Sequence, residues 1–253
     1  MKVYTFGNNK DKSIMLIPGT CCHWKENFED VIPLLLENKY FVNIVSFTGF
    51  DESDNDTFTS MLDETKKIEE YILNNLNGKI DLVYGCSLGG SIVGLLIQRK
   101  IVHITYGILG SSDLDQNSKI IAKIKSNIAV PILYKMVSKG EYPSIFKRKM
   151  ESDTTPYMKK FMSLFGSGKF PFIKEESVYN QFYTDLITPL ENDISVDNTT
   201  VYAFYAKKMG KKYLARYKKH FKNLSIVEHD LRHEELLVCY PDKWVEEIVR
   251  ILK

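Results

Sequence analysis

Short apolar runs alternate with longer segments of helical period, and this alternation limits the possible folds more than any other feature of the chain. Each run has the length of a buried strand, and a helix between two strands lets them run in the same direction. The pattern therefore predicts an α/β fold with a mostly parallel central sheet and helices on both faces. The predicted strands are 13–17, 41–47, 80–84, 104–109, 200–205 and 224–227, with 2–6 as a further edge strand.

One helix is predicted between the strands at 41–47 and 80–84. Apolar side chains recur at helical spacing from Phe58 to Leu76, Asp56 is the candidate N-cap, and Gly78 follows where the helix would end. This segment completes a β-α-β unit that leads into the strand at 80–84.

Residues 114–197 break the alternation. They carry helical patterns punctuated by Pro and Gly but no convincing strand, and they are too long for an ordinary connection. We therefore predict a core formed by residues 1–113 and 198–253, with a helical cap inserted at 114–197.

Charge and hydropathy favour no macromolecular partner. The chain carries 34 basic and 32 acidic residues, a net charge of +2, so no overall field would attract nucleic acid or an anionic membrane. The amino terminus lacks a signal-like apolar core, and no run reaches ~18 apolar residues. We expect a cytoplasmic protein without membrane insertion, and the oligomeric state stays open.

Three further patterns are interpreted as structural. The four cysteines show no CxxC spacing, so we expect reduced thiols and neither a disulfide nor a metal site. The acidic segment 51–56 lacks the glycine and the glutamate of a calcium loop. The basic stretch 207–222 has helical spacing and is predicted to be an amphipathic helix with its lysines in water.

A Gly-x-Ser-x-Gly motif carries the strongest chemical signal. Gly85, Ser87 and Gly89 follow the predicted strand 80–84 and open a helical segment. A serine on such a tight turn is strained and exposed, and only small residues fit beside it. The helix amino terminus also favours negative charge next to the hydroxyl. Ser87 is the predicted nucleophile; the alternative is a helix-capping serine.

The loop after strand 13–17 is the second candidate element. The backbone N–H groups of Thr20 and Leu88 are the predicted donors of an oxyanion hole, with Cys21 as the alternative to Thr20. His23 could line the substrate pocket or be an ordinary loop histidine.

Two histidines follow the last predicted strand. An imidazole can accept and return a proton near neutral pH, as a general base must. His233 lies in the loop and is the predicted base, whereas His229 lies at the strand end and is more plausibly structural.

Together these elements resemble the α/β-hydrolase superfamily over nearly the whole chain. The resemblance implies a serine mechanism with an acyl-enzyme intermediate and no metal or organic cofactor. It also implies a triad acid after the penultimate strand, but Lys208 and Met209 occupy that place.

The acid is therefore predicted elsewhere. Asp113 follows strand 104–109 and is assigned as the triad acid with Asp115 in reserve, although Asp113 could instead cap the first cap helix. Glu228, Asp230 or a Ser-His dyad without an acid are the remaining alternatives.

The cap is rich in apolar and aromatic residues, which favours a small hydrophobic acyl substrate held as an ester or thioester. The alternatives are an amide, peptide or C–C bond hydrolase on the same fold, and a non-catalytic protein that binds a small ligand.

Overall fold

The computed structural model describes residues 1–153, 155–165 and 170–253. Seven strands form one sheet in the order β1-β3-β2-β4-β5-β6-β7. Only β1 pairs in antiparallel fashion, with β3, and the other neighbours are parallel. The predicted sheet and its edge strand are confirmed. The strands are β1 (Lys2–Phe6), β2 (Lys12–Ile17), β3 (Tyr40–Ser46), β4 (Lys79–Cys86), β5 (His103–Gly110), β6 (Thr200–Ala206) and β7 (Leu224–His229).

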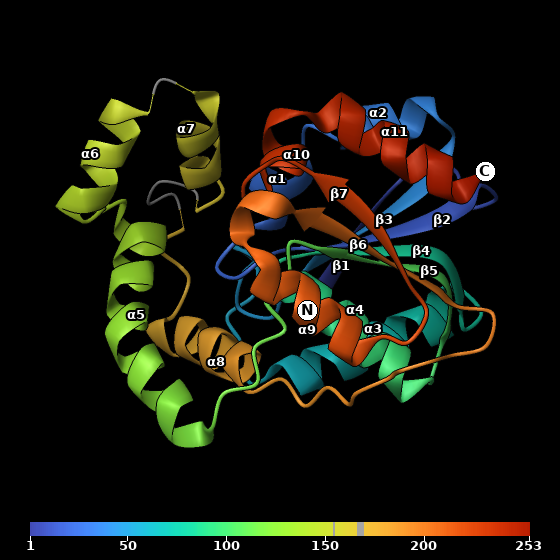
Figure 1. Ribbon diagram of the computed structural model, residues 1–253, viewed down its shortest axis with the longest axis horizontal. Coiled ribbons are helices and arrows are strands. Elements are labelled where there is room, and N and C mark those ends of the chain that lie inside the picture. Colours follow the sequence, from blue (N-terminus) through green and yellow to red (C-terminus); the bar gives the residue numbers. More distant parts are fainter. Residues whose placement is uncertain (154, 166–169) are drawn as a thin grey trace.

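Helices cover both faces of the sheet (Figure 1). In β2, Ile14 and Leu16 join one buried cluster while Met15 and Ile17 join the other, because successive side chains point to opposite faces. Burial on both faces explains why the strands are continuous apolar runs. The cluster that contains Ile14 and Leu16 includes residues of α1 (Trp24–Phe28), α2 (Ile32–Glu37), α10 (Glu235–Cys239) and α11 (Pro241–Leu252). The cluster that contains Met15 and Ile17 includes residues of α3 (Met61–Asn75), α4 (Leu88–Arg99) and α9 (Lys211–His220).

The start of α3 differs from the prediction. Its N-cap is Ser60 and not Asp56, because the Ser60 hydroxyl accepts a hydrogen bond from the Asp63 N–H at 3.1 Å. Phe58 is buried in the loop before the helix. Gly78 ends the segment as predicted, with φ +72° and its N–H bonded to the Ile72 carbonyl.

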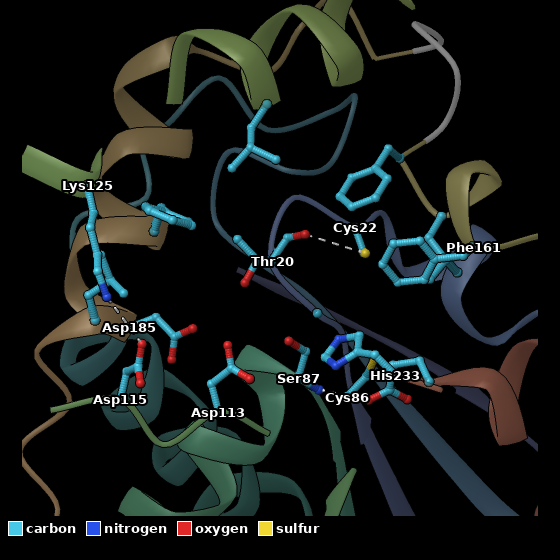
Figure 2. Close-up of a pocket in the computed structure, with 17 residues that line it drawn as sticks. Thr20, Cys22, Cys86, Ser87, Asp113, Asp115, Lys125, Phe161, Asp185 and His233 are labelled. Carbon is cyan, nitrogen blue, oxygen red and sulfur yellow. Dashed lines mark hydrogen bonds and ion pairs between the residues drawn. The ribbon is translucent and has the colours of Figure 1, made fainter. Parts of the chain in front are cut away.

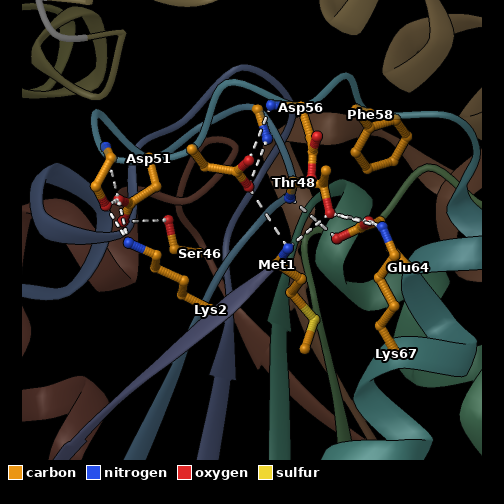
Figure 3. Close-up of polar contacts among 12 residues, drawn as sticks. Met1, Lys2, Ser46, Thr48, Asp51, Asp56, Phe58, Glu64 and Lys67 are labelled. Carbon is orange, nitrogen blue, oxygen red and sulfur yellow. Dashed lines mark hydrogen bonds and ion pairs between the residues drawn. The ribbon is translucent and has the colours of Figure 1, made fainter.

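Polar contacts tie the loop after β3 to β1 and α3 (Figure 3). The Met1 amino group donates to Thr48 Oγ1 at 2.8 Å, and that hydroxyl donates to Glu64 Oε1 at 2.6 Å. Lys67 pairs with Glu64 at 2.7 Å, so this fully buried carboxylate has a cation and a hydroxyl as partners. The Asp51 carboxylate accepts hydrogen bonds from the Ser53 N–H at 3.1 Å and, from β1, from the Tyr4 hydroxyl at 2.5 Å and the Lys2 amino group at 3.3 Å. The described residues include no group of three or more His, Cys, Asp or Glu side chains that could hold a metal.

In the part of this segment that the structure describes, four helices lie between β5 and β6, where the insertion is predicted: α5 (Lys119–Lys139), α6 (Ser144–Ser152), α7 (Pro156–Ser163) and α8 (Glu175–Leu186). They stand to one side of the sheet, and α8 lies between α5 and the core (Figure 1). Asn180 of α8 donates to the Phe58 carbonyl at 2.9 Å, which anchors the insertion to the loop before α3. The exact domain boundaries stay a prediction. No helix among the described residues is long and apolar enough to cross a membrane.

Candidate active site

The turn between β4 and α4 holds Ser87 in a strained conformation, with φ 49° and ψ −112°. A Cβ on Gly85 would lie 2.1 Å from the Gly89 carbonyl atoms, and one on Gly89 would lie 2.3 Å from the Ile17 oxygen. Neither position can carry a side chain, which explains both glycines of the motif. The Ser87 N–H donates to the Gly110 carbonyl at 2.7 Å and fixes the turn to β5.

A cavity of about 330 Å³ opens over Ser87 (Figure 2). Its size suits a small organic ligand. The core supplies most of its polar lining, including Thr20, Ser87, Asp113, His233 and Glu234. The segment between β5 and β6 supplies the apolar side chains that line it, namely Leu133, Phe161, Leu164, Phe165, Phe182 and Leu186.

His233 lines this cavity, and Figure 2 shows its ring beside the Ser87 hydroxyl. Burial lowers the pKa of the His233 imidazole to about 4. The ring meets Phe161 edge-on at 5.9 Å between centroids, and the His233 carbonyl accepts from the Tyr157 hydroxyl at 2.9 Å. His229 is not among the described residues that line the cavity. The structure thus places His233, and not His229, with the predicted nucleophile.

Asp113 also lines the cavity, but Figure 2 shows it on the opposite side of Ser87 from His233. Burial, with the charge of Asp115, raises the pKa of Asp113 to about 6. In the described part of the chain, no hydrogen bond or ion pair joins Asp113 to His233. The expected pairing of these two residues is therefore corrected.

Contacts with α9 explain where Asp113 lies. The Tyr217 hydroxyl donates to the Ser112 carbonyl at 2.6 Å, and Arg216 donates to the Asp113 carbonyl at 2.7 Å. These bonds hold the loop after β5 toward α9 and the cap. The role of Asp113 as triad acid stays a prediction, with no contact to support it.

The reserve acids do not reach His233 either. Asp115 forms ion pairs with Arg216 and, at 3.9 Å, with Lys125. Glu228 and Asp230 are exposed and lie outside the cavity lining. Among the described residues, the His233 ring makes no hydrogen bond to a carboxylate, so no described contact supplies a triad acid.

Glu234 is a site residue that the sequence reasoning missed. Its carboxylate accepts the Ser87 N–H at 3.1 Å and the Tyr84 hydroxyl at 3.0 Å, and its own N–H donates to Ser111 Oγ at 3.1 Å. Burial raises the pKa of Glu234 to about 7. Glu234 thus joins the loop that carries His233 to the turn that carries Ser87. Its place next to His233 in the sequence was the one available signal.

Asp185 of α8 was missed as well. It lines the cavity near Asp113 and Asp115, and its Oδ1 atom is buried without a hydrogen-bond partner in the described residues. Burial raises the pKa of Asp185 to about 7. Nothing in the local sequence marks this residue, because its burial depends on how α8 packs.

The loop after β2 leaves one suitable oxyanion donor. The Cys21 N–H donates to Gln181 Oε1 at 2.6 Å, and the Cys22 N–H donates to the Gly19 carbonyl at 3.2 Å. The Thr20 and Leu88 N–H groups make no hydrogen bond within the described residues, and Thr20 lines the cavity. This arrangement favours Thr20 over Cys21 as the partner of Leu88.

His23 has a structural role, and the expectation that it lines the pocket is corrected. Its ring caps α1 through the Lys25 N–H, pairs with Glu26 at 2.8 Å and stacks on Phe170 at 4.8 Å. It is not among the described residues that line the cavity.

Comparison with known proteins agrees with this architecture. No family model and no curated protein matches the sequence. Among solved structures, the chain is similar to an α/β hydrolase family protein from Desulfitobacterium hafniense, with a TM-score of 0.81, 18% identity and 100% of both chains covered. It is also similar to a lipase-esterase related protein from Clostridium acetobutylicum, with a TM-score of 0.71, 18% identity and coverage of 99% of this chain and 98% of the other.

A thermophilic esterase from Thermogutta terrifontis is a further structural neighbour, with a TM-score of 0.72, 13% identity and coverage of 100% of this chain and 94% of the other. Identities this low establish the fold alone. The chain has the α/β-hydrolase fold, as the resemblance in its sequence implied.

Proposed function

We propose that this protein is a serine hydrolase that cleaves a carboxylic ester or thioester of a small hydrophobic acyl group. The observation that carries the proposal is the strained Ser87, which opens into a cavity also lined by His233. Strain of this kind persists only where the surrounding structure imposes it, and it is concentrated at functional sites.

In the proposed acylation, Ser87 Oγ attacks the substrate carbonyl while His233 accepts the hydroxyl proton. The carbonyl oxygen gains negative charge and accepts hydrogen bonds from the Thr20 and Leu88 N–H groups. Collapse of this intermediate breaks the bond to the leaving group, which takes the proton from His233. An acyl-Ser87 ester remains.

Deacylation uses the same groups with water as the nucleophile. His233 accepts a proton from water, and the resulting hydroxide attacks the acyl-Ser87 carbonyl. The oxyanion donors act again, and His233 returns the proton to Ser87 as the carboxylic acid leaves. The lowered pKa of His233 keeps its imidazole neutral, and so free to accept a proton, at neutral pH, while the same burial makes it a weaker base than an exposed histidine.

The acyl preference is assigned to the cap side of the cavity. Phe161, Phe182 and Leu186 contribute to an apolar wall that an aliphatic chain can fill. Each buried methylene contributes about 0.8 kcal/mol at most, so short chains gain affinity until the cavity is full.

A second candidate is a hydrolase-like protein that binds a small hydrophobic ligand without turnover. The specific observation in its favour is the lack of a carboxylate partner for His233 among the described residues. Without such a partner the imidazolium formed in acylation is less stable, and kcat can fall by ~10⁴.

Steady-state hydrolysis of p-nitrophenyl butyrate separates the two candidates. Wild-type protein should turn over the ester, and Ser87→Ala should not, with its circular dichroism and Tm unchanged. The matched control is Ser163→Ala, which removes an exposed hydroxyl of α7 outside this cavity and should keep full activity. Equal rates for wild type and Ser87→Ala would reject the hydrolase proposal, whereas binding without turnover by wild type would favour the second candidate.

A further inference from the structure

An unpartnered apolar stripe runs along the outer side of α5. Its five isoleucines have exposed fractions of 74%, 48%, 56%, 67% and 40%, in the order Ile120, Ile121, Ile124, Ile128 and Ile132. At 100° per residue they fall within an arc of about 120°, so they share one face over roughly 18 Å of helix. This set is called the α5 stripe below.

The stripe is unusual for this molecule. Six of the ten large hydrophobic residues that are exposed among the described residues lie on α5 and α6, and the remaining four are scattered over the core. Single exposed apolar residues need no explanation, but a continuous apolar surface marks an interaction site. The opposite face of α5 is already used, because Ala122, Ser126 and Val130 are buried there.

Lysines border and extend the stripe. Lys123 and Lys125 flank Ile124, while Lys135 and Lys139 continue the line of Ile128 and Ile132 at spacings of three and four residues. Lys125 pairs with Asp115, and the other α5 lysines form no ion pair with a described residue. No acidic residue occurs in α5.

Charge is separated across the whole chain. Helices α5, α6 and α7 together carry ten basic residues and one acidic residue, and the rest of the chain carries 24 basic and 31 acidic residues. The net charge of +2 therefore conceals a strongly positive set of three helices, whereas the rest of the chain, which includes α8, is net negative. An anionic surface would attract these three helices and repel the rest of the chain, which favours an orientation with α5 toward that surface.

We propose that the α5 stripe docks on an anionic lipid bilayer, with the isoleucines at the level of the acyl chain boundary and the lysines among the headgroups. An interfacial helix needs this combination of an apolar face and basic residues, and it does not need the length of a spanning helix. A second copy of this chain fits less well. Pairing two stripes would bring two sets of lysines together with no acidic residue of α5 to neutralise them.

The same helix reaches the candidate active site. Leu133 and Lys125 of α5 line the cavity over Ser87, whereas the isoleucines of the stripe are exposed and do not line it. Docking through α5 therefore brings the cavity close to the bilayer surface. The docking proposal does not depend on catalysis by Ser87, so Ser87→Ala protein should bind vesicles as wild type does.

The test is co-sedimentation of the full chain with vesicles of phosphatidylcholine, alone or with about 30 mol% phosphatidylglycerol. We expect binding to the anionic vesicles that is at least tenfold tighter than to phosphatidylcholine and that weakens at raised salt. The double variant Ile124→Ser/Ile128→Ser and the double variant Lys135→Glu/Lys139→Glu should each lower the affinity at least tenfold. The matched control is Leu73→Ser/Ile101→Ser, which changes two exposed residues of the core and should bind as wild type.

Circular dichroism establishes that each variant is folded before it is scored. The proposal would be overturned if wild type did not bind, if it bound both vesicle types with equal affinity, or if neither the isoleucine variant nor the lysine variant bound more weakly than wild type. Sedimentation velocity supplies a further readout. A stable dimer that Ile124→Ser/Ile128→Ser dissociates would show that the stripe is a self-interface, which would also overturn it.

Discussion

The core and the cap contribute different things to one cavity. The core supplies Thr20, Ser87 and His233 from turns whose backbone is fixed by close packing and by hydrogen bonds. The cap supplies the apolar wall from side chains on helices, and it also carries the α5 stripe. The proposed chemistry therefore depends on backbone geometry that tolerates almost no change, while the proposed substrate fit depends on side chains that can vary one at a time.

The largest expected effect comes from the core. His233→Ala should lower kcat for p-nitrophenyl butyrate by about 10³-fold or more, because no other imidazole among the described residues lines the cavity. His229→Ala is the matched control, since His229 lies outside the cavity and should affect stability more than kcat. A His229 variant with the larger kcat loss would show that the wrong histidine has been assigned.

A second test compares two acids of the core. Asp113→Asn should retain kcat within about tenfold of wild type, a change under ~1.4 kcal/mol, because Asp113 does not contact His233. Glu234→Gln should cost about tenfold, since it weakens the bond that joins the base loop to the nucleophile turn. The kcat values of both variants, measured by stopped-flow and steady-state kinetics and compared with wild type, test this prediction. A loss above ~100-fold in Asp113→Asn would show that Asp113 acts as the triad acid although it does not contact His233 in this structure.

Cap variants should change selectivity rather than chemistry. Wild-type kcat/KM should rise from acetyl to hexanoyl p-nitrophenyl esters by at most about fourfold per methylene. Phe182→Ala should flatten this trend, and Tyr183→Ala, a neighbour on α8 that does not line the cavity, should not. Equal kcat/KM for acetyl and hexanoyl esters in wild type would remove the argument for an apolar wall.

The smallest effect is on stability, through Asp185 of the cap. Burial raises the pKa of Asp185 to about 7, so in the folded state its carboxyl stays protonated to higher pH than in the unfolded chain. Its contribution to stability is present at low pH and is lost as the pH rises through about 7. The Tm of Asp185→Asn relative to wild type should therefore rise by a few degrees between pH 5 and pH 8.

The matched control for this pH dependence is Asp197→Asn, which changes an exposed carboxylate and should keep a constant difference from wild type across the same range. Differential scanning calorimetry measures both variants. A constant difference for Asp185→Asn would show that its carboxyl is not perturbed by burial.

The contrast between core and cap also explains what the sequence could predict. Strands buried on both faces leave continuous apolar runs, and a nucleophile turn needs glycines at fixed offsets, so the sheet and the Ser87 turn carry local signals. Asp185 carries no local signal, and Glu234 only its place next to His233, because the burial of both depends on packing between distant segments. The N-cap of α3 was missed because acidic and hydroxyl residues crowd 51–60, and any of several could cap a helix.

The most direct test of the account is to locate the nucleophile chemically. The wild-type protein is treated with a fluorophosphonate, digested, and mapped by tandem mass spectrometry, with Ser87→Ala treated in parallel. The account predicts a single phosphonyl adduct on Ser87, formed rapidly in wild type and absent from Ser87→Ala. An adduct on another residue, or no adduct on folded wild-type protein, would contradict the assignment of Ser87 as an activated nucleophile.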